Sequence, residues 1–183
     1  MTAQADMFRA AGTALFSADG RCRFTLTREW GPGILVCFIG LNPSTATADT
    51  DDPTIRRCIA FAKREGGGRL FMQNLFGWRS TDPAALIGAP GIVGEPPEEL
   101  GVRADTADLI ICAWGAIHKS LRWRADQVSD MLPGDPRLRC LGRTKGGDPR
   151  HPLYVRGDAP LMPWPAAVAC SRSAPTRSPR SPK

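Results

Sequence analysis

The chain has 183 residues, of which 42% are hydrophobic, so it is long enough to fold as one domain with a proper core. Its formal net charge is +6, but four of the basic residues lie in residues 166–183, which contain no acid, so the rest of the chain carries only about +2. A charge this small permits nucleic-acid binding without requiring it.

The composition also argues against several kinds of site and location. The six cysteines form no C-x-x-C pair and no cluster with histidine, so we expect no zinc or iron–sulfur site. We also expect no other metal and no cofactor. No apolar run is long enough to span a bilayer, and the first residues lack the basic and apolar order of a signal peptide. We therefore expect a cytoplasmic protein with buried, reduced thiols and no membrane partner.

The first part of the chain has the pattern of strands that end in a polar turn. Residues 1–30 begin helix-like and then show a short alternating strand at 22–27, which suits the edge of a sheet. The apolar run at 34–39 predicts a buried strand. This strand leads directly into the polar turn at 40–45, so polar atoms are expected at its end.

A helix and a second strand are predicted next. The apolar spacing over 55–64 is typical of an amphipathic helix, with acids and Pro53 near its start and three glycines after its end. A second apolar strand is predicted at 69–74. The segment 78–100 is rich in Pro and Gly and is expected to be a long connection, with a short helix at 82–86.

The last part of the chain continues the alternation. A third strand is predicted at 109–114, a helix at 116–132 and a fourth strand at 137–141, followed by a Gly-rich loop at 142–151. Residues 166–183 are rich in Ala, Ser, Pro and Arg. That composition predicts a disordered basic tail, because it buries too little apolar surface to offset the entropy of ordering.

Strands that alternate with helices favour a parallel sheet that is covered on both faces. We therefore predict an α/β fold, a three-layer α/β/α sandwich with a central, mostly parallel sheet of about four or five strands. Residues 1–165 would form this single domain. The oligomeric state is not predicted.

Three polar clusters follow the predicted strands. Asn42 and Ser44 come after the first, Asn74 ends the second, and Trp78 follows it. The third cluster consists of Arg143, Lys145, Arg150 and His151. Each cluster by itself is explained by ordinary turn chemistry. In a parallel sheet, however, the carboxyl ends of the strands share one edge, where ligands bind, so the three clusters are expected to lie together.

Nearly the whole body of the chain, residues 24–164, resembles an uncharacterised prokaryotic and phage family known as domain of unknown function 1643. The matching segments are Gly40-Leu-Asn-Pro-Ser-Thr45, Asp52-Pro-Thr-Ile-Arg-Arg57, Asn74-Leu-Phe76, Ala113-Trp-Gly115, Thr144-Lys145 and Pro149-Arg-His-Pro-Leu-Tyr154. This resemblance implies a family but no reaction.

The order of the motifs is also similar to that of the uracil-DNA glycosylase superfamily, whose α/β/α proteins remove bases from DNA. Gly40-Leu-Asn-Pro43 resembles the first motif of that superfamily, which implies that Asn42 holds the attacking water; Ser44 stands where the glycosylases usually have glycine. Asn74 resembles the asparagine that reads the base edge. His151-Pro152 resembles the motif whose histidine stabilises the leaving base.

These implied roles agree with the chemistry of the side chains. An asparagine amide donates and accepts at once, which suits the adjacent N–H and carbonyl of a pyrimidine edge. An imidazole near the base oxygen stabilises the negative charge of the departing base. Asn42 could only position water, because an amide is no general base at neutral pH. Trp78 is a candidate to stack on a base, and Arg143, Lys145 and Arg150 are candidates for phosphate contacts.

The expected function is therefore the binding of a nucleobase, in DNA or in a nucleotide, by a glycosylase-like site that includes Gly40, Pro43 and Ser44. Hydrolysis of the N-glycosidic bond is the expected reaction. One alternative is a module of the same fold that binds nucleic acid or a nucleotide without hydrolysis. Another is a hydrolase of small modified nucleotides, in which Arg56, Arg57 and Arg143 hold a phosphate.

Overall fold

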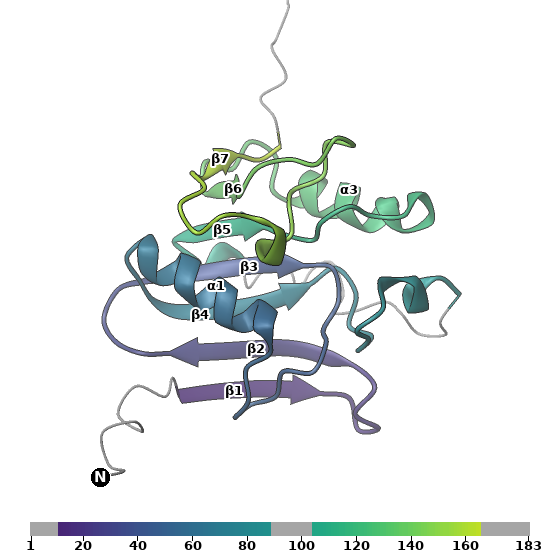
Figure 1. Ribbon diagram of the computed structural model, residues 1–183, viewed down its shortest axis with the longest axis horizontal. Coiled ribbons are helices and arrows are strands. Elements are labelled where there is room, and N and C mark those ends of the chain that lie inside the picture. The colour runs from purple at the N-terminus through teal and green to yellow at the C-terminus, as the bar shows by residue number, and fades with distance from the viewer. Residues whose placement is uncertain (1–10, 89–103, 166–183) are drawn as a thin grey trace, which may run out of the picture.

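The computed structural model describes residues 11–88 and 104–165 (Figure 1). Within these residues, seven strands form one sheet in the spatial order β1-β2-β4-β3-β5-β6-β7. The strands are β1 (Ala11–Phe16), β2 (Arg23–Glu29), β3 (Ile34–Gly40), β4 (Gly67–Asn74), β5 (Leu109–Cys112), β6 (Leu138–Cys140) and β7 (Met162–Pro163). The helices are α1 (Pro53–Arg64) and α3 (Arg122–Met131), with 3-10 turns η2 (Pro83–Leu86), η3 (Lys119–Leu121) and η4 (Pro152–Tyr154).

The sheet is parallel at its centre and antiparallel at its sides. Strands β4, β3, β5 and β6 run parallel to their neighbours in this group. Strand β2 pairs antiparallel with β4, β1 with β2, and β7 with β6. The α/β class is thus confirmed, but the expectation of a mostly parallel sheet of four or five strands is wrong, because flanking antiparallel strands make the sheet wider and more mixed.

The prediction of a helix-like start is also wrong for those of its residues that the structure describes. Residues 11–16 form β1, whose Thr13 hydroxyl lies 2.7 Å from the Thr27 hydroxyl of β2. Its Ala-Gly-Thr-Ala sequence has little strand character of its own. The strand exists because β2 offers it a partner, and the turn before β2 is held by Ser17 Oγ, which donates to Asp19 Oδ1 at 2.6 Å.

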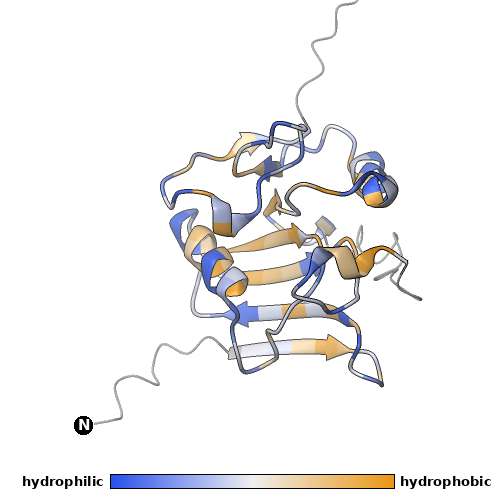
Figure 2. Cartoon of the chain, turned by 45° about the vertical axis from the view of Figure 1, so that its right-hand side comes forward, coloured by the Kyte–Doolittle hydropathy of each residue, from blue (hydrophilic) through white to orange (hydrophobic). Residues whose placement is uncertain are grey.

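One helix packs on each face of the central strands. The predicted helix 55–64 is confirmed as α1, which begins at Asp52, whose Oδ1 accepts from the backbone N–H of Ile55 at 2.8 Å. Its buried Cys58 and Phe61 pack in one cluster with Val36 and Phe38 of β3. Figure 2 shows the hydrophobic residues concentrated in these central strands.

Helix α3 covers the other face. Its Ala125 and Val128 pack in a second cluster with Ile39 and Ile110. The helix predicted over 116–132 is partly confirmed, because α3 begins only at Arg122 and follows the 3-10 turn η3. His118 begins that turn, since its Nδ1 accepts from the Ser120 N–H at 3.4 Å. The short helix predicted at 82–86 is confirmed as the 3-10 turn η2.

No helix within the described ranges is long and apolar enough to cross a membrane. Four cysteines in these ranges, Cys37, Cys58, Cys112 and Cys140, are buried and form no disulfide, and Cys22 is half-buried and forms none either. Burial raises the pKa of the Cys58 thiol above its ordinary value, so this thiol stays protonated at neutral pH. The predicted disordered tail, residues 166–183, lies outside the described residues.

Candidate functional site

The carboxyl ends of β3 and β4 meet the amino end of β2 at one edge of the sheet. Gly40 and Asn74 are register partners in the last positions of the two parallel strands, and Arg23 is the first residue of the antiparallel strand beside them. A cavity of about 750 Å³ lies at this edge. The first turn of α1 and residues from the segment 144–154 complete its wall.

Most of the predicted site residues line this one cavity. They are Gly40, Asn42, Ser44, Asn74, Lys145, Arg150 and His151. Pro43, Trp78 and Arg143 do not line it. Residues from all three polar clusters after the predicted strands therefore reach a common cavity, although they are separated by up to about a hundred residues in the chain.

Asn74 places an unpaired amide at the cavity. The residue is only 5% exposed, and neither its Nδ2 nor its Oδ1 has a hydrogen-bond partner within the described residues. A buried, unpaired polar group costs about 1–3 kcal/mol. Because buried polar side chains are nearly always hydrogen-bonded, an amide left unpaired at the wall of a cavity is a candidate to bind a ligand.

Asn42 has a fixed amide orientation. Its Nδ2 donates to the carbonyl oxygens of Pro43, Trp78 and Ser80 at 3.1, 3.3 and 2.9 Å. These bonds tie the loop after β3 to the loop after β4. They also leave Oδ1 as the free end of the amide, because a flipped amide would place Oδ1 against three carbonyl oxygens. Within the described residues, Oδ1 accepts no hydrogen bond.

His151 presents a neutral ring to the cavity. Its Nδ1 accepts from the backbone N–H of Leu153 at 3.3 Å, so the neutral imidazole carries its proton on Nε2. Burial lowers the pKa of His151 below its ordinary value, and the negative charge of Asp52 opposes this shift. The ring is therefore predominantly neutral at pH 7 and offers one N–H donor.

The backbone around His151 is held by its neighbours. The Gly115 N–H donates to the Pro149 carbonyl at 2.9 Å, and a Cβ at Gly115 would lie 3.2 Å from the His151 Cβ. On the other side, Arg57 of α1 donates to the carbonyl oxygens of Pro152 and Val155. The loop after β5 and helix α1 thus position the histidine from both sides.

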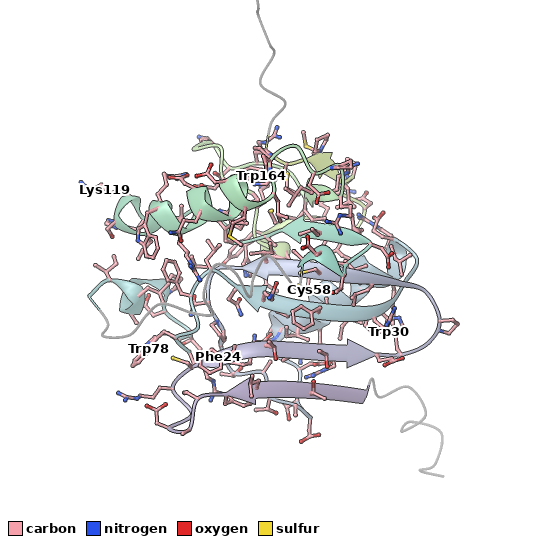
Figure 3. The ribbon with its side chains drawn as sticks, turned by 180° about the vertical axis from the view of Figure 1, so that it is seen from behind. Phe24, Trp30, Cys58, Trp78, Lys119 and Trp164 are labelled. Carbon is pink, nitrogen blue, oxygen red and sulfur yellow. The ribbon has the colours of Figure 1, made fainter. Side chains whose placement is uncertain are left out.

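The three predicted residues that do not line the cavity have other surroundings. The Pro43 carbonyl accepts from Asn42 and from the Ser80 N–H. Trp78 lines a second, smaller hollow, where the Arg21 guanidinium lies 5.6 Å from its ring. Arg143 donates to the Pro163 carbonyl at 2.7 Å and lies over the Trp164 ring. Figure 3 shows Trp164 on the side of β6 and β7, far from Trp78.

Lys145 and Arg150 lie on an ordered loop. Both side chains are exposed. The Thr144 N–H donates to the Asp148 carbonyl at 2.8 Å, and the buried Asp148 carboxylate forms an ion pair with Arg122 at 3.0 Å. The Gly-rich sequence therefore folds into a defined turn that holds two cations at the cavity.

The cavity has further polar residues that the strand-end pattern did not single out. Arg23 is buried with Nε unpaired, and the Trp114 Nε1 is also buried and unpaired within the described residues. Burial lowers the pKa of Arg23 to about 10. The sequence did not identify Arg23, because polar residues were expected to form a site only at the carboxyl ends of strands. Strand β2 is antiparallel to β4, so its amino end, where Arg23 lies, reaches this edge.

Asp52 lines the cavity as well, but both of its oxygens are engaged. Oδ1 accepts from Ile55 N–H and Oδ2 from Ala46 N–H at 3.4 Å. This supports the helix-start role expected from the sequence. Neighbouring Asp51 instead pairs with Arg28 at 2.8 Å. Among the described residues, no group of three His, Cys, Asp or Glu side chains could hold a metal ion.

The comparison with known proteins identifies a family but no activity. Residues 23–153 match the family described as "Protein of unknown function (DUF1643)". No curated protein matches the chain significantly. A solved alpha/beta hydrolase from Novosphingobium aromaticivorans is similar at 13% identity and a TM-score of 0.30, over 73% of this chain and 45% of that one, which is too weak to indicate a function. Since the family match spans most of its length, the chain belongs to the DUF1643 family.

Proposed function

We propose that the cavity binds a nucleobase and that the protein hydrolyses the N-glycosidic bond of that base. The observation that carries the proposal is the buried, unpaired amide of Asn74 in a cavity that Asn42 and His151 also line. The Asn74 amide would donate to the carbonyl of a pyrimidine edge and accept from the adjacent N–H. Both atoms of the Asn74 amide are buried, so the cavity wall must shift slightly before they can contact a base. The flexible Met72 side chain, which lies in that wall, is suited to such a movement.

The other two residues would act on either side of the glycosidic bond. Asn42 Oδ1 would accept a hydrogen bond from water and leave the water's lone pair free to attack the sugar carbon. His151 Nε2–H would donate to a base oxygen as the departing base becomes negatively charged. The water, the sugar carbon and the base must then lie in line. The water oxygen forms the new C–O bond as the C–N bond breaks, the electron pair of the C–N bond leaves with the base, and the proton that the water loses passes through solvent to the departing base.

The rival proposal is binding without hydrolysis, and one observation favours it. Asn42 has a structural role through its three carbonyl contacts, and Asp52 uses both oxygens on backbone N–H groups. Neither residue is a free general base. Hydrolysis by this site would therefore be restricted to bases that are intrinsically good leaving groups.

The test is release of free base from single- and double-stranded oligonucleotides and from nucleotides that carry uracil, hypoxanthine, xanthine or mismatched thymine. The variants are His151→Ala and Asn42→Ala, with His118→Ala as the matched control because His118 does not line the cavity. Circular dichroism and melting temperature check that each variant is folded.

We expect release by the wild type and the His118→Ala protein and its loss in the folded His151→Ala protein. No release from any substrate with protein in excess would exclude the hydrolase. If base-containing ligands then still raise the melting temperature, the site is a binding module. A nucleobase function is excluded altogether if they do not.

A further inference from the structure

Arg23 is a buried cation with few partners. The residue is 2% exposed and lines the cavity. Of the five N–H donors of its guanidinium, one donates to the Ala46 carbonyl at 3.1 Å, and Nε is buried without a partner within the described residues. No acid in these residues lies within ion-pair distance of it; Asp52 acts on it only through its more distant negative charge.

Arg28 of the same strand is buried to the same extent as Arg23 but is well paired. It is also 2% exposed, but it forms an ion pair with Asp51 at 2.8 Å and donates to the carbonyl oxygens of Thr27 and Thr47 at 2.7 and 2.6 Å. Burying a cation without such partners costs several kcal/mol. Arg23 lacks the partners that offset this cost for Arg28, and this difference requires an explanation.

The surroundings of Arg23 favour a negatively charged ligand. Among the residues that the structure describes, the cationic side chains that line the cavity are Arg23, Lys145 and Arg150, and the one carboxylate that lines it is that of Asp52. The first turn of α1 lines the cavity too, and the N-terminus of a helix attracts anions. The uncharged ring of His151 adds a donor and no negative charge.

We propose that Arg23 lies at the bottom of a phosphate-binding subsite in this cavity. The ligand would then be a nucleotide and not a free nucleobase or nucleoside. The phosphate subsite is argued from Arg23 itself. It rests on the proposed function only for the statement that the rest of the ligand is a nucleoside. Arg23 would donate two hydrogen bonds to phosphate oxygens. Lys145 and Arg150, which are exposed, would add charge at the mouth of the cavity.

The test uses four probes that separate phosphate from base. They are uridine 5′-monophosphate, ribose 5-phosphate, uridine and the dinucleotide UpU, each titrated by calorimetry. For the wild type we expect ribose 5-phosphate to bind. We also expect uridine 5′-monophosphate to bind more tightly than uridine by about tenfold or more, because a hydrogen bond between charged groups contributes about that much affinity. A preference for UpU over the monophosphate would place the phosphate in a polynucleotide, and the reverse preference would place it in a free nucleotide.

Three variants test the role of Arg23 itself. Arg23→Met removes the charge and keeps the bulk, Arg23→Lys keeps the charge, and Arg156→Met is the charge-matched control, because Arg156 is exposed and does not line the cavity. We expect Arg23→Met to lose the phosphate-dependent affinity, Arg23→Lys to keep part of it and Arg156→Met to keep all of it. Since Arg23→Met removes a poorly paired buried charge, its melting temperature should equal or exceed that of the wild type.

The outcomes separate this proposal from the nucleobase proposal. Equal binding of uridine and its monophosphate by the wild type, or unchanged phosphate affinity in Arg23→Met, would overturn the subsite. If Arg23→Met does not fold, a lowered phosphate affinity in folded Arg23→Lys supports the subsite and unchanged affinity overturns it. If the monophosphate binds no better than ribose 5-phosphate, the nucleobase proposal fails while an Arg23-dependent phosphate affinity stands.

Discussion

Gly40 makes room for the side chain of Asn74, its register partner on the neighbouring strand. A Cβ at position 40 would lie 2.7 Å from Asn74 Oδ1 and 2.6 Å from the Met72 Cε, both closer than real Cβ contacts. The glycine at the end of β3 therefore allows the amide to reach the wall of the cavity. Its backbone role is separate, since its carbonyl accepts from the Leu75 N–H at 2.8 Å.

We expect Gly40→Ala to disturb the cavity because the new methyl group displaces Asn74 or Met72. Overpacking of this kind costs about 1–3 kcal/mol of unfolding free energy, and ligand affinity should fall with it. Urea denaturation and ligand titration measure the two effects. Gly146→Ala is the control, because a Cβ there would meet no atom closer than 3.8 Å. Wild-type stability and affinity in Gly40→Ala would refute the assigned role.

Asn74→Leu should separate stability from binding. Leucine has a similar volume and removes two polar atoms that have no partner within the described residues. The melting temperature should therefore stay the same or rise, whereas binding of uracil-containing ligands should fall by about tenfold or more. Thermal unfolding and calorimetry test both parts. A large loss of stability would mean that the amide has an internal partner in solution and is not kept for a ligand.

Asn42→Asp tests whether the amide of Asn42 is needed as a donor. A carboxylate cannot donate, and it would face the carbonyl oxygens of Pro43, Trp78 and Ser80. We expect both Asn42→Asp and Asn42→Ala to lower the unfolding free energy, by about 1–3 kcal/mol for alanine and by more for aspartate. The midpoint and slope of urea denaturation give these values. An aspartate variant as stable as the wild type would contradict the structural role.

The lowered pKa of His151 makes stability depend on pH. As the pH falls through about 6.5, the unfolded chain takes up a proton at this histidine, whereas the folded protein does so only at lower pH. The unfolding free energy contributed by His151 therefore decreases from about pH 6.5 down to the folded pKa. His151→Gln should lack this part of the pH profile. An NMR titration of the ring gives the pKa directly, and a midpoint at or above 6.5 would refute the prediction.

Much of the local structure follows from the sequence alone. The apolar run at 34–39 is long and uniform enough to identify β3, and Asp52, Pro53 and the apolar spacing identify the start and the buried face of α1. Strand β1 could not be predicted in this way. Its first four residues, Ala-Gly-Thr-Ala, are small, and the strand is stabilised by β2 across the sheet.

The site divides in the same way. The sequence by itself determined that Asn42 and Asn74 lie where apolar strands end and that His151 lies in the Gly-rich loop after the fourth predicted strand, because strand and turn patterns are properties of each local segment. Only the tertiary structure decided that Trp78 and Arg143 lie away from the cavity and that Arg23 joins it. The direction of β2, and hence which of its ends reaches the site, depends on its pairing with β4, and pairing between strands far apart in the chain leaves no mark in either strand's own residues.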